Sequence, residues 1–205
     1  MEYLFIIIIL IFSIVIHEVS HGAVANLLGD PTAKHAGRLT LNPIKHLDPM
    51  GSVILPLLLI LIKSPFLFGW AKPVPINPYN FRDQKYGSAK TALAGPAANL
   101  ILALIFGLAL RFLPAPIVSS GLVFMFSYIV YINLLLAIFN LLPIPPLDGS
   151  HLLYTFLPYS MENIKVFLNQ FGIFILFFII FFLFRWVILI INWLFALIVG
   201  TPLFS

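Results

Sequence analysis

The chain has 205 residues, of which 61% are hydrophobic and only 9% are charged, and its mean hydropathy is +1.09. This composition excludes an ordinary soluble domain, and the long apolar runs lack the alternation of barrel strands, so we expect an all-α protein that spans the bilayer several times. The formal net charge of +4 forms no basic cluster, which argues against nucleic-acid binding, and the absence of cysteine excludes disulfides and thiolate metal ligands.

The first apolar run, 3–28, predicts a membrane-spanning helix. Residues 23–25 have the small side chains of a signal-peptide cleavage site, but residues 1–3 carry no positive charge ahead of the apolar run. Cleavage there would also discard the polar motif at 17–21. We therefore expect this helix to be retained.

That motif reads HEVSH. On a helix His17 and His21 share one face and can present imidazole nitrogens to a single ion, while Glu18 lies beside them. Zinc hydrolases use this pattern, because two histidines leave room for another protein ligand and a water whose proton the glutamate takes. Three residues can match by chance, but each ionisable group at membrane depth costs about 2.5–3.5 kcal/mol, which a bound cation would offset.

Two polar loops, 29–51 and 70–87, hold most of the Lys and Arg residues, so both should face the cytoplasm. The apolar run between them, 52–68, is interrupted by prolines and a lysine. We expect it to be re-entrant or interfacial, which leaves both loops on one side. Short strands are expected near the membrane surface at 38–41 and 74–76, where an edge strand could hold a substrate extended.

The run 88–112 predicts the next helix and contains AGPAAN at 94–99. Small residues allow close approach of helix backbones in lipid. Two interpretations of Asn99 stay open: a hydrogen bond between helices, or a contact with a substrate or its oxyanion.

The following helix, 120–142, ends in NLLPIPPLDG at 140–149, whose prolines cannot continue a helix. Backbone groups freed at that depth are tolerated only beside a wet cavity or inside protein. Asp148 emerges there and could supply a third metal ligand, and Asn140 is, like Asn99, a candidate contact for the substrate or oxyanion.

HEVSH and Asp148 both lie toward the C-terminal ends of their helices. The two helices must therefore run in the same direction to share an ion, which requires an odd number of crossings between them. The helix at 88–112 supplies one crossing, so 52–68 should supply none. This agrees with the positions of the two basic loops.

Two further histidines are weaker candidates. His46, close to Asp48, could form a second metal site, but a lone loop histidine is more often solvated or a cap. His151 follows the LDG turn and could lie near the metal ligands.

The last apolar run, 168–199, contains Arg185 near its middle, so it is either one tilted helix or two shorter pieces. We expect one membrane-embedded domain over 1–205, with a catalytic core at about 1–151 and C-terminal helices at about 168–199. About five to six transmembrane or re-entrant helices are expected in all.

The motifs HEVSH, GWAKPVPINP, ALAGPAAN and NLLPIPPLDG, in this order, resemble the site-2 protease family of intramembrane zinc metalloproteases, in its short prokaryotic form without a PDZ or CBS domain. The resemblance covers most of 2–151. It implies that His17, His21 and Asp148 bind one Zn²⁺ per chain, that Glu18 is the catalytic base and that Asn99 assists near the site. It also implies cleavage of transmembrane segments within the bilayer.

These features predict a multi-pass protein of the cell membrane with its active site toward the cytoplasmic side. Its partners would be a transmembrane protein or peptide substrate and the lipid bilayer. The alternative is a metal-ion transporter or other metal-binding membrane protein, because His and Asp residues at membrane depth also line ion pathways. Glu18 separates the two, since zinc binds without it but hydrolysis needs it.

Overall fold

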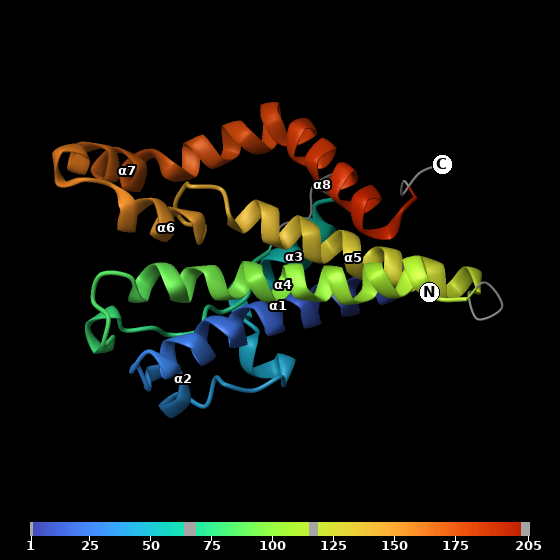
Figure 1. Cartoon of the computed structure of the whole chain (residues 1–205), viewed down its shortest axis with the longest axis horizontal. Helices are drawn as coiled ribbons and strands as arrows, with labels where there is room; N and C mark the ends of the chain where they lie inside the picture. Colours follow the sequence, from blue (N-terminus) through green and yellow to red (C-terminus); the bar gives the residue numbers. More distant parts are fainter. Residues whose placement is uncertain (1, 64–68, 115–118, 202–205) are drawn as a thin grey trace.

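The computed structural model describes residues 2–63, 69–114 and 119–201. Three long helices lie side by side (Figure 1): α1 at Glu2–Leu27, α4 at Gly87–Phe112 and α5 at Ser120–Asn140. They contain 26, 26 and 21 residues, so at about 1.5 Å per residue each reaches across a bilayer core of about 30 Å. The helices predicted at 3–28, 88–112 and 120–142 are confirmed, with small shifts at their ends.

A fourth apolar helical run covers Glu162–Val199. It consists of α7 at Glu162–Phe178, a π-helical turn at Ile179–Leu183 and α8 at Phe184–Val199, and the ribbon changes direction between α7 and α8 (Figure 1). The run begins earlier than the predicted 168, and of the two alternatives the bent, two-piece form is observed. The described residues thus contain four candidate membrane spans.

The long helices alternate in direction. In Figure 1, α1 runs from the labelled N-terminus toward α2, α4 runs back, and α5 runs in the same direction as α1. The C-terminal ends of α1 and α5 therefore meet at one end of the bundle, where the short helices α2 (Thr32–His35) and α6 (Gly149–Phe156) lie. The parallel arrangement predicted for the helices that carry HEVSH and precede Asp148 is confirmed.

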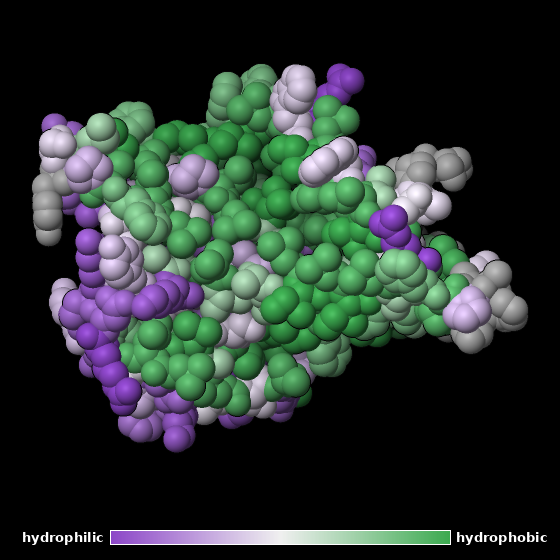
Figure 2. All heavy atoms as spheres, viewed as in Figure 1, coloured by the Kyte–Doolittle hydropathy of each residue, from purple (hydrophilic) through white to green (hydrophobic). Residues whose placement is uncertain are grey.

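A cluster of buried apolar residues lies where α8 covers α4 and α5. It is formed by Ala103, Val130, Leu134, Val187, Ile191, Phe195 and Ile198. Many large apolar side chains instead face outward, and the space-filling view shows them as a broad hydrophobic surface, with hydrophilic residues gathered at the end that carries the loops between α1 and α4 (Figure 2). An apolar belt with a polar end is the surface expected of a protein embedded in lipid.

The described residues at the two sides of the segment 52–68 lie together. The Trp70 amide donates to the Gly51 carbonyl at 3.2 Å, and the Ser52 hydroxyl donates to the Trp70 carbonyl at 2.7 Å. Helix α3, Leu55–Leu61, has only seven residues, about 10 Å, and residues 64–68 lie outside the described part of the chain. Because Gly51 and Ser52 are hydrogen-bonded to Trp70, the chain enters and leaves this segment at the same end of the bundle. This agrees with the prediction that the segment does not cross the membrane.

The strands predicted at 38–41 and 74–76 are wrong, because among the described residues there is no strand at either place. Pro73 and Pro75 have no N–H group to offer a strand ladder. The one intervening amide, that of Val74, donates to the Glu18 carboxylate, and the Arg38 guanidinium occupies the carbonyls of Lys72 and Pro73. With these groups occupied by side chains, the two segments do not pair.

Candidate metal centre

Two imidazoles meet on the inner face of α1. His17 and His21 are one helical turn apart, each is only 6% exposed, and their Nε2 atoms are 3.0 Å apart. The rings are nearly perpendicular, with centroids 4.6 Å apart. The helical spacing that suggested a shared ligand face therefore places both nitrogens at one point.

Asp148 reaches the same point from the other side of the bundle. Its Oδ2 lies 3.0 Å from His17 Nε2 and 3.2 Å from His21 Nε2. The carboxylate comes from the turn after α5, which contains a cis peptide bond between Pro145 and Pro146 and leads into α6.

Gly149 lets the chain turn closely enough to aim this carboxylate. A Cβ on Gly149 would lie 2.3 Å from the Leu141 carbonyl oxygen and 2.4 Å from that of Leu142. No larger residue fits without moving the backbone at the end of α5. The glycine after Asp148 is thus required by close packing.

A further shell of hydrogen bonds orients the rings. His17 Nδ1 lies 2.5 Å from the Asn99 Oδ1 atom, and His21 Nδ1 lies 2.7 Å from the Thr91 carbonyl oxygen. Because both partners are acceptors, each Nδ1 carries the proton, and each Nε2 of the neutral ring presents a lone pair. Two lone pairs and a carboxylate oxygen therefore converge, an arrangement that a cation at their centre would stabilise.

The residues present fit a divalent cation. Donor atoms of His17, His21 and Asp148 all lie within 4.8 Å of one another, and nitrogen with carboxylate oxygen is a donor set that zinc accepts. Gly95 of α4 borders the same space, since a Cβ there would lie 2.4 Å from His21 Nε2 and 2.6 Å from His17 Nε2. The sequence indicates only close helix packing for the small residues at 94–98, but at Gly95 the missing side chain also leaves room beside the ligand atoms.

Asn99 is completely buried, and both ends of its amide are occupied within the protein. While Oδ1 faces His17, Nδ2 donates to Asn133 Oδ1 at 2.7 Å, and Asn133 Nδ2 donates to the Ser13 hydroxyl at 3.0 Å. Of the two interpretations of Asn99, the structure shows the hydrogen bond between helices. Ser13 and Asn133 were missed; the signal that could have found them is a polar side chain with apolar residues directly on both sides of it in a helix that spans the membrane.

Glu18 lies beside the three converging atoms without joining them. Its Oε2 accepts a hydrogen bond of 2.8 Å from the Val74 amide. The segment that carries this amide is held by Arg38, which is only 6% exposed and donates to the Lys72 carbonyl at 2.7 Å. A buried guanidinium thus anchors the backbone that orients the glutamate.

A cavity of about 380 Å³ opens in front of these groups. Its walls include Glu18, Asp148, Val74, Asn140 and His151. Asn140, whose Nδ2 donates to the Leu136 carbonyl at 2.9 Å, and His151, which is exposed, lie on this wall but not among the converging donor atoms. The cavity places a glutamate and three donor atoms around one space accessible to a small group.

The second metal site considered at His46 is not present. His46 is 2% exposed and its Nε2 lies 2.9 Å from the Thr40 carbonyl oxygen, while the Asp48 carboxylate accepts from the Gly51 amide. Across 2–63, 69–114 and 119–201, the histidines and acids form one possible metal-binding group, the one at His17, His21 and Asp148.

Comparison with known proteins points to the same chemistry. Residues 112–183 match the model of peptidase family M50, a range that contains Asp148 but not HEVSH. A Bacillus subtilis protein named putative zinc metalloprotease YwhC is 40% identical over 177 residues, which cover 83% of this chain and 77% of the relative.

Two further relatives carry similar names. Putative zinc metalloprotease Rip2 of Mycolicibacterium smegmatis is 34% identical over 169 residues, 81% of this chain and 62% of that protein. Putative zinc metalloprotease MJ0611 of Methanocaldococcus jannaschii is 46% identical over 67 residues, 32% of this chain and 33% of that protein. No solved structure matches the chain significantly.

Proposed function

Because this chain belongs to peptidase family M50, the site-2 protease family, we propose that it is an intramembrane zinc metalloprotease that hydrolyses peptide bonds in the transmembrane segments of membrane proteins. The observation that carries the proposal is the convergence of His17 Nε2, His21 Nε2 and Asp148 Oδ2 next to the Glu18 carboxylate. These four residues would be the three zinc ligands and the catalytic base.

The role of each residue follows from its contacts. When bound, zinc supplies a Lewis acid that polarises the scissile carbonyl and lowers the pKa of a water. Glu18 takes the proton of the attacking water and delivers it to the leaving amine, and the Val74 amide holds its carboxylate in place. Asn99 and the Thr91 carbonyl keep the ligating face of each histidine free of a proton.

The surroundings support a substrate within the membrane. The histidines and Glu18 are carried by α1, which is itself a candidate membrane span, and Asp148 lies in the Pro-rich turn that follows another, Ser120–Asn140. Both loops rich in Lys and Arg lie at the end of the bundle near the site, so we place that end in the cytoplasm. A helical substrate must unwind locally to expose a peptide carbonyl there, since its carbonyls are otherwise hydrogen-bonded within the helix.

The experiment compares purified wild-type protein with Glu18→Gln and Asp148→Ala in lipid vesicles. We expect one zinc per chain in wild type and in Glu18→Gln, but loss of cleavage of transmembrane peptides by about 10²-fold or more in Glu18→Gln. Asp148→Ala should lose zinc and cleavage together, because one ligand is gone.

Cleavage by Glu18→Gln at the wild-type rate would contradict the proposal. The alternative of metal-ion transport makes the opposite prediction: zinc flux into vesicles that survives Glu18→Gln, with no peptide cleaved by either protein. Comparing membrane-protein fragments in cells with wild type or Glu18→Gln would then identify the substrates.

A further inference from the structure

A second, larger cavity adjoins the catalytic cavity. It has a volume of about 560 Å³ and shares two lining residues, Ser88 and His151, with the cavity that contains Glu18 and Asp148. Both volumes lie within the range of ordinary ligand pockets, about 300–1,000 Å³. The two cavities therefore border the same two side chains, Ser88 and His151.

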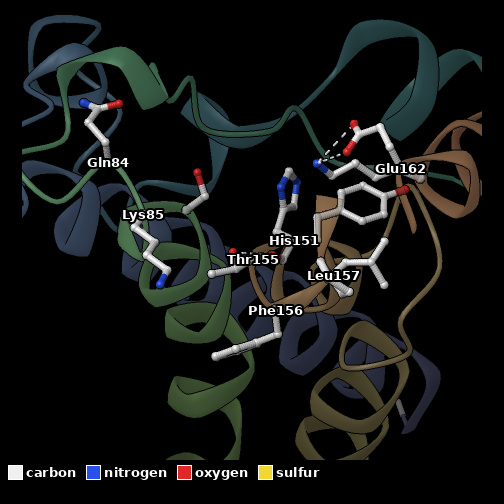
Figure 3. Close-up of a pocket in the computed structure, with 11 residues that line it drawn as sticks. Gln84, Lys85, His151, Thr155, Phe156, Leu157 and Glu162 are labelled. Atoms are coloured by element: carbon white, nitrogen blue, oxygen red, sulfur yellow. Dashed lines mark hydrogen bonds and ion pairs between the residues drawn. The ribbon is translucent and has the colours of Figure 1, made fainter. Parts of the chain in front are cut away.

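The walls of this cavity come from separate parts of the fold. Gln84 and Lys85, just before α4, form one wall, while α6 and the first turn of α7 form the other (Figure 3). In Figure 3, His151 lies between Lys85 on one side and Glu162 on the other. The second cavity therefore lies at the polar end of the bundle.

Its lining is polar and weakly basic. Lys85 is exposed, and Lys165 of α7, half-buried, lies 3.4 Å from a Glu162 carboxylate oxygen. The two lysines on opposite walls outnumber the one acidic residue of the lining, and Phe156 and Leu157 add apolar surface between them. Such a lining suits an extended peptide that carries an acidic side chain better than a lipid-embedded helix.

We propose that this second cavity binds the residues of the substrate that flank the scissile bond on the polar side of the membrane, and that Lys85 and Lys165 favour acidic side chains among them. This inference rests on the proposed function, because a peptide cleaved in the first cavity must continue on both sides of the cut. One side remains with the membrane, and in this proposal the other side enters the second cavity past Ser88 and His151.

The test reverses the charge of selected side chains in the substrate and, separately, in the enzyme. Two transmembrane peptides differ only in the polar flank, which carries either Glu or Lys residues next to the cleavage position, and both are assayed in phosphatidylcholine vesicles. Wild type should cleave the Glu peptide with a kcat/KM about fivefold higher, a magnitude typical of partly exposed charge pairs. K85E/K165E should reverse this preference, and K85Q/K165Q should abolish it.

The control is K34E/K45E, which reverses two exposed lysines at the same end of the molecule that line neither cavity. It should keep the wild-type preference. Zinc content and thermal unfolding of each variant verify that its fold is intact, and the neutral pair replaces the charge-reversed pair if the latter unfolds.

Three results would overturn the inference. The first is equal cleavage of both peptides by every variant, which leaves the protease function itself in place. The second is a preference that follows added phosphatidylglycerol instead of the peptide, since the lysines would then bind lipid headgroups. The third is cleavage of neither peptide by zinc-loaded wild type, which would contradict the proposed function as well.

Discussion

At the scale of single residues, the geometry of the candidate metal centre depends on which nitrogen of each histidine carries the proton. His17 and His21 direct Nδ1 to the acceptors Asn99 and Thr91, so their other nitrogens meet the carboxylate of Asp148. Placing these polar groups at membrane depth is costly unless each is hydrogen-bonded or bound to a cation. The series of hydrogen bonds from His17 through Asn99 and Asn133 to Ser13 gives these side chains their partners, and a bound zinc ion would supply the cation.

Asn99→Ala should weaken zinc binding about 10- to 100-fold while leaving all three ligands in place. The reason is that His17 loses the acceptor that fixes its tautomer and ring orientation. Competition with a chromophoric zinc chelator in detergent measures the effect. Asn140→Ala is the matched control: this amide lines the same cavity but donates to its own helix, so zinc affinity should not change. Equal affinities for wild type and Asn99→Ala would refute the role of Asn99.

At the scale of elements, three helices cooperate to build the site. The parallel helices α1 and α5 bring HEVSH and the Pro-rich turn to the same end of the bundle, and α4 packs antiparallel against both. Gly95 on α4 faces the ligand nitrogens, so the close packing of α4 on α1 also sets the room available for an ion. The proline at 96 lies inside α4 next to this glycine.

Gly95→Ala should therefore damage the metal centre. The added Cβ would lie 2.4 Å from His21 Nε2, so either the imidazoles or the helix must move, at a cost of about 1–3 kcal/mol. We expect zinc occupancy and peptide cleavage to fall together. The control is Gly121→Ala in α5, where an added Cβ has no atom within 4 Å. Full zinc occupancy in Gly95→Ala would show that α4 can move aside.

At the scale of the whole molecule, an apolar belt is joined to one polar end. The two loops at that end are tied together by Asp30, which is fully buried and accepts hydrogen bonds from the Asn77 amide at 2.7 Å and the Asn80 side chain at 2.8 Å. The Arg82 amide also donates to the Leu28 carbonyl. These contacts hold the segment that orients Glu18 against the end of α1.

Asp30→Asn should reduce the free energy of unfolding at neutral pH by about 1.5–3 kcal/mol, the range for hydrogen bonds to a charged group. Burial raises the pKa of Asp30, but the hydrogen bonds from Thr32, Asn77 and Asn80 together lower the pKa by more than burial raises it. The pKa in the folded protein therefore lies below 3.8. The stabilisation is therefore complete above about pH 4 and is lost as the pH falls through the folded pKa.

Thermal unfolding in detergent between pH 3 and pH 7 tests this. The curves for wild type and Asp30→Asn should differ at pH 7, and the difference should begin to shrink below about pH 4 and vanish only below the folded pKa of Asp30. Glu162→Gln, which removes an exposed carboxylate at the same end, should follow wild type throughout. A difference between wild type and Asp30→Asn that persists unchanged into acid would exclude the charged hydrogen bonds as its cause.

Much of this protein could be predicted from local patterns along the chain. Long apolar runs identify the spans because a helix in lipid satisfies its own backbone and needs no partner to do so. The spacing of His17 and His21 likewise predicts a shared face from helix geometry alone. The Pro-rich break before Asp148 marked the place where the helix must end.

Only the tertiary structure decided which polar groups pair at the site, because the partners lie far apart in sequence. Asn99 and Asp148 are 82 and 131 residues from His17, and no local pattern states which atoms of each would meet. The strands predicted at 38–41 and 74–76 failed for the same reason, since Arg38 and Glu18 occupy the backbone groups a ladder would need. The amino-acid order by itself determined which segments are helical in lipid; long-range hydrogen bonds determined how their polar groups are paired, because burial in lipid leaves each such group dependent on whatever the fold brings beside it.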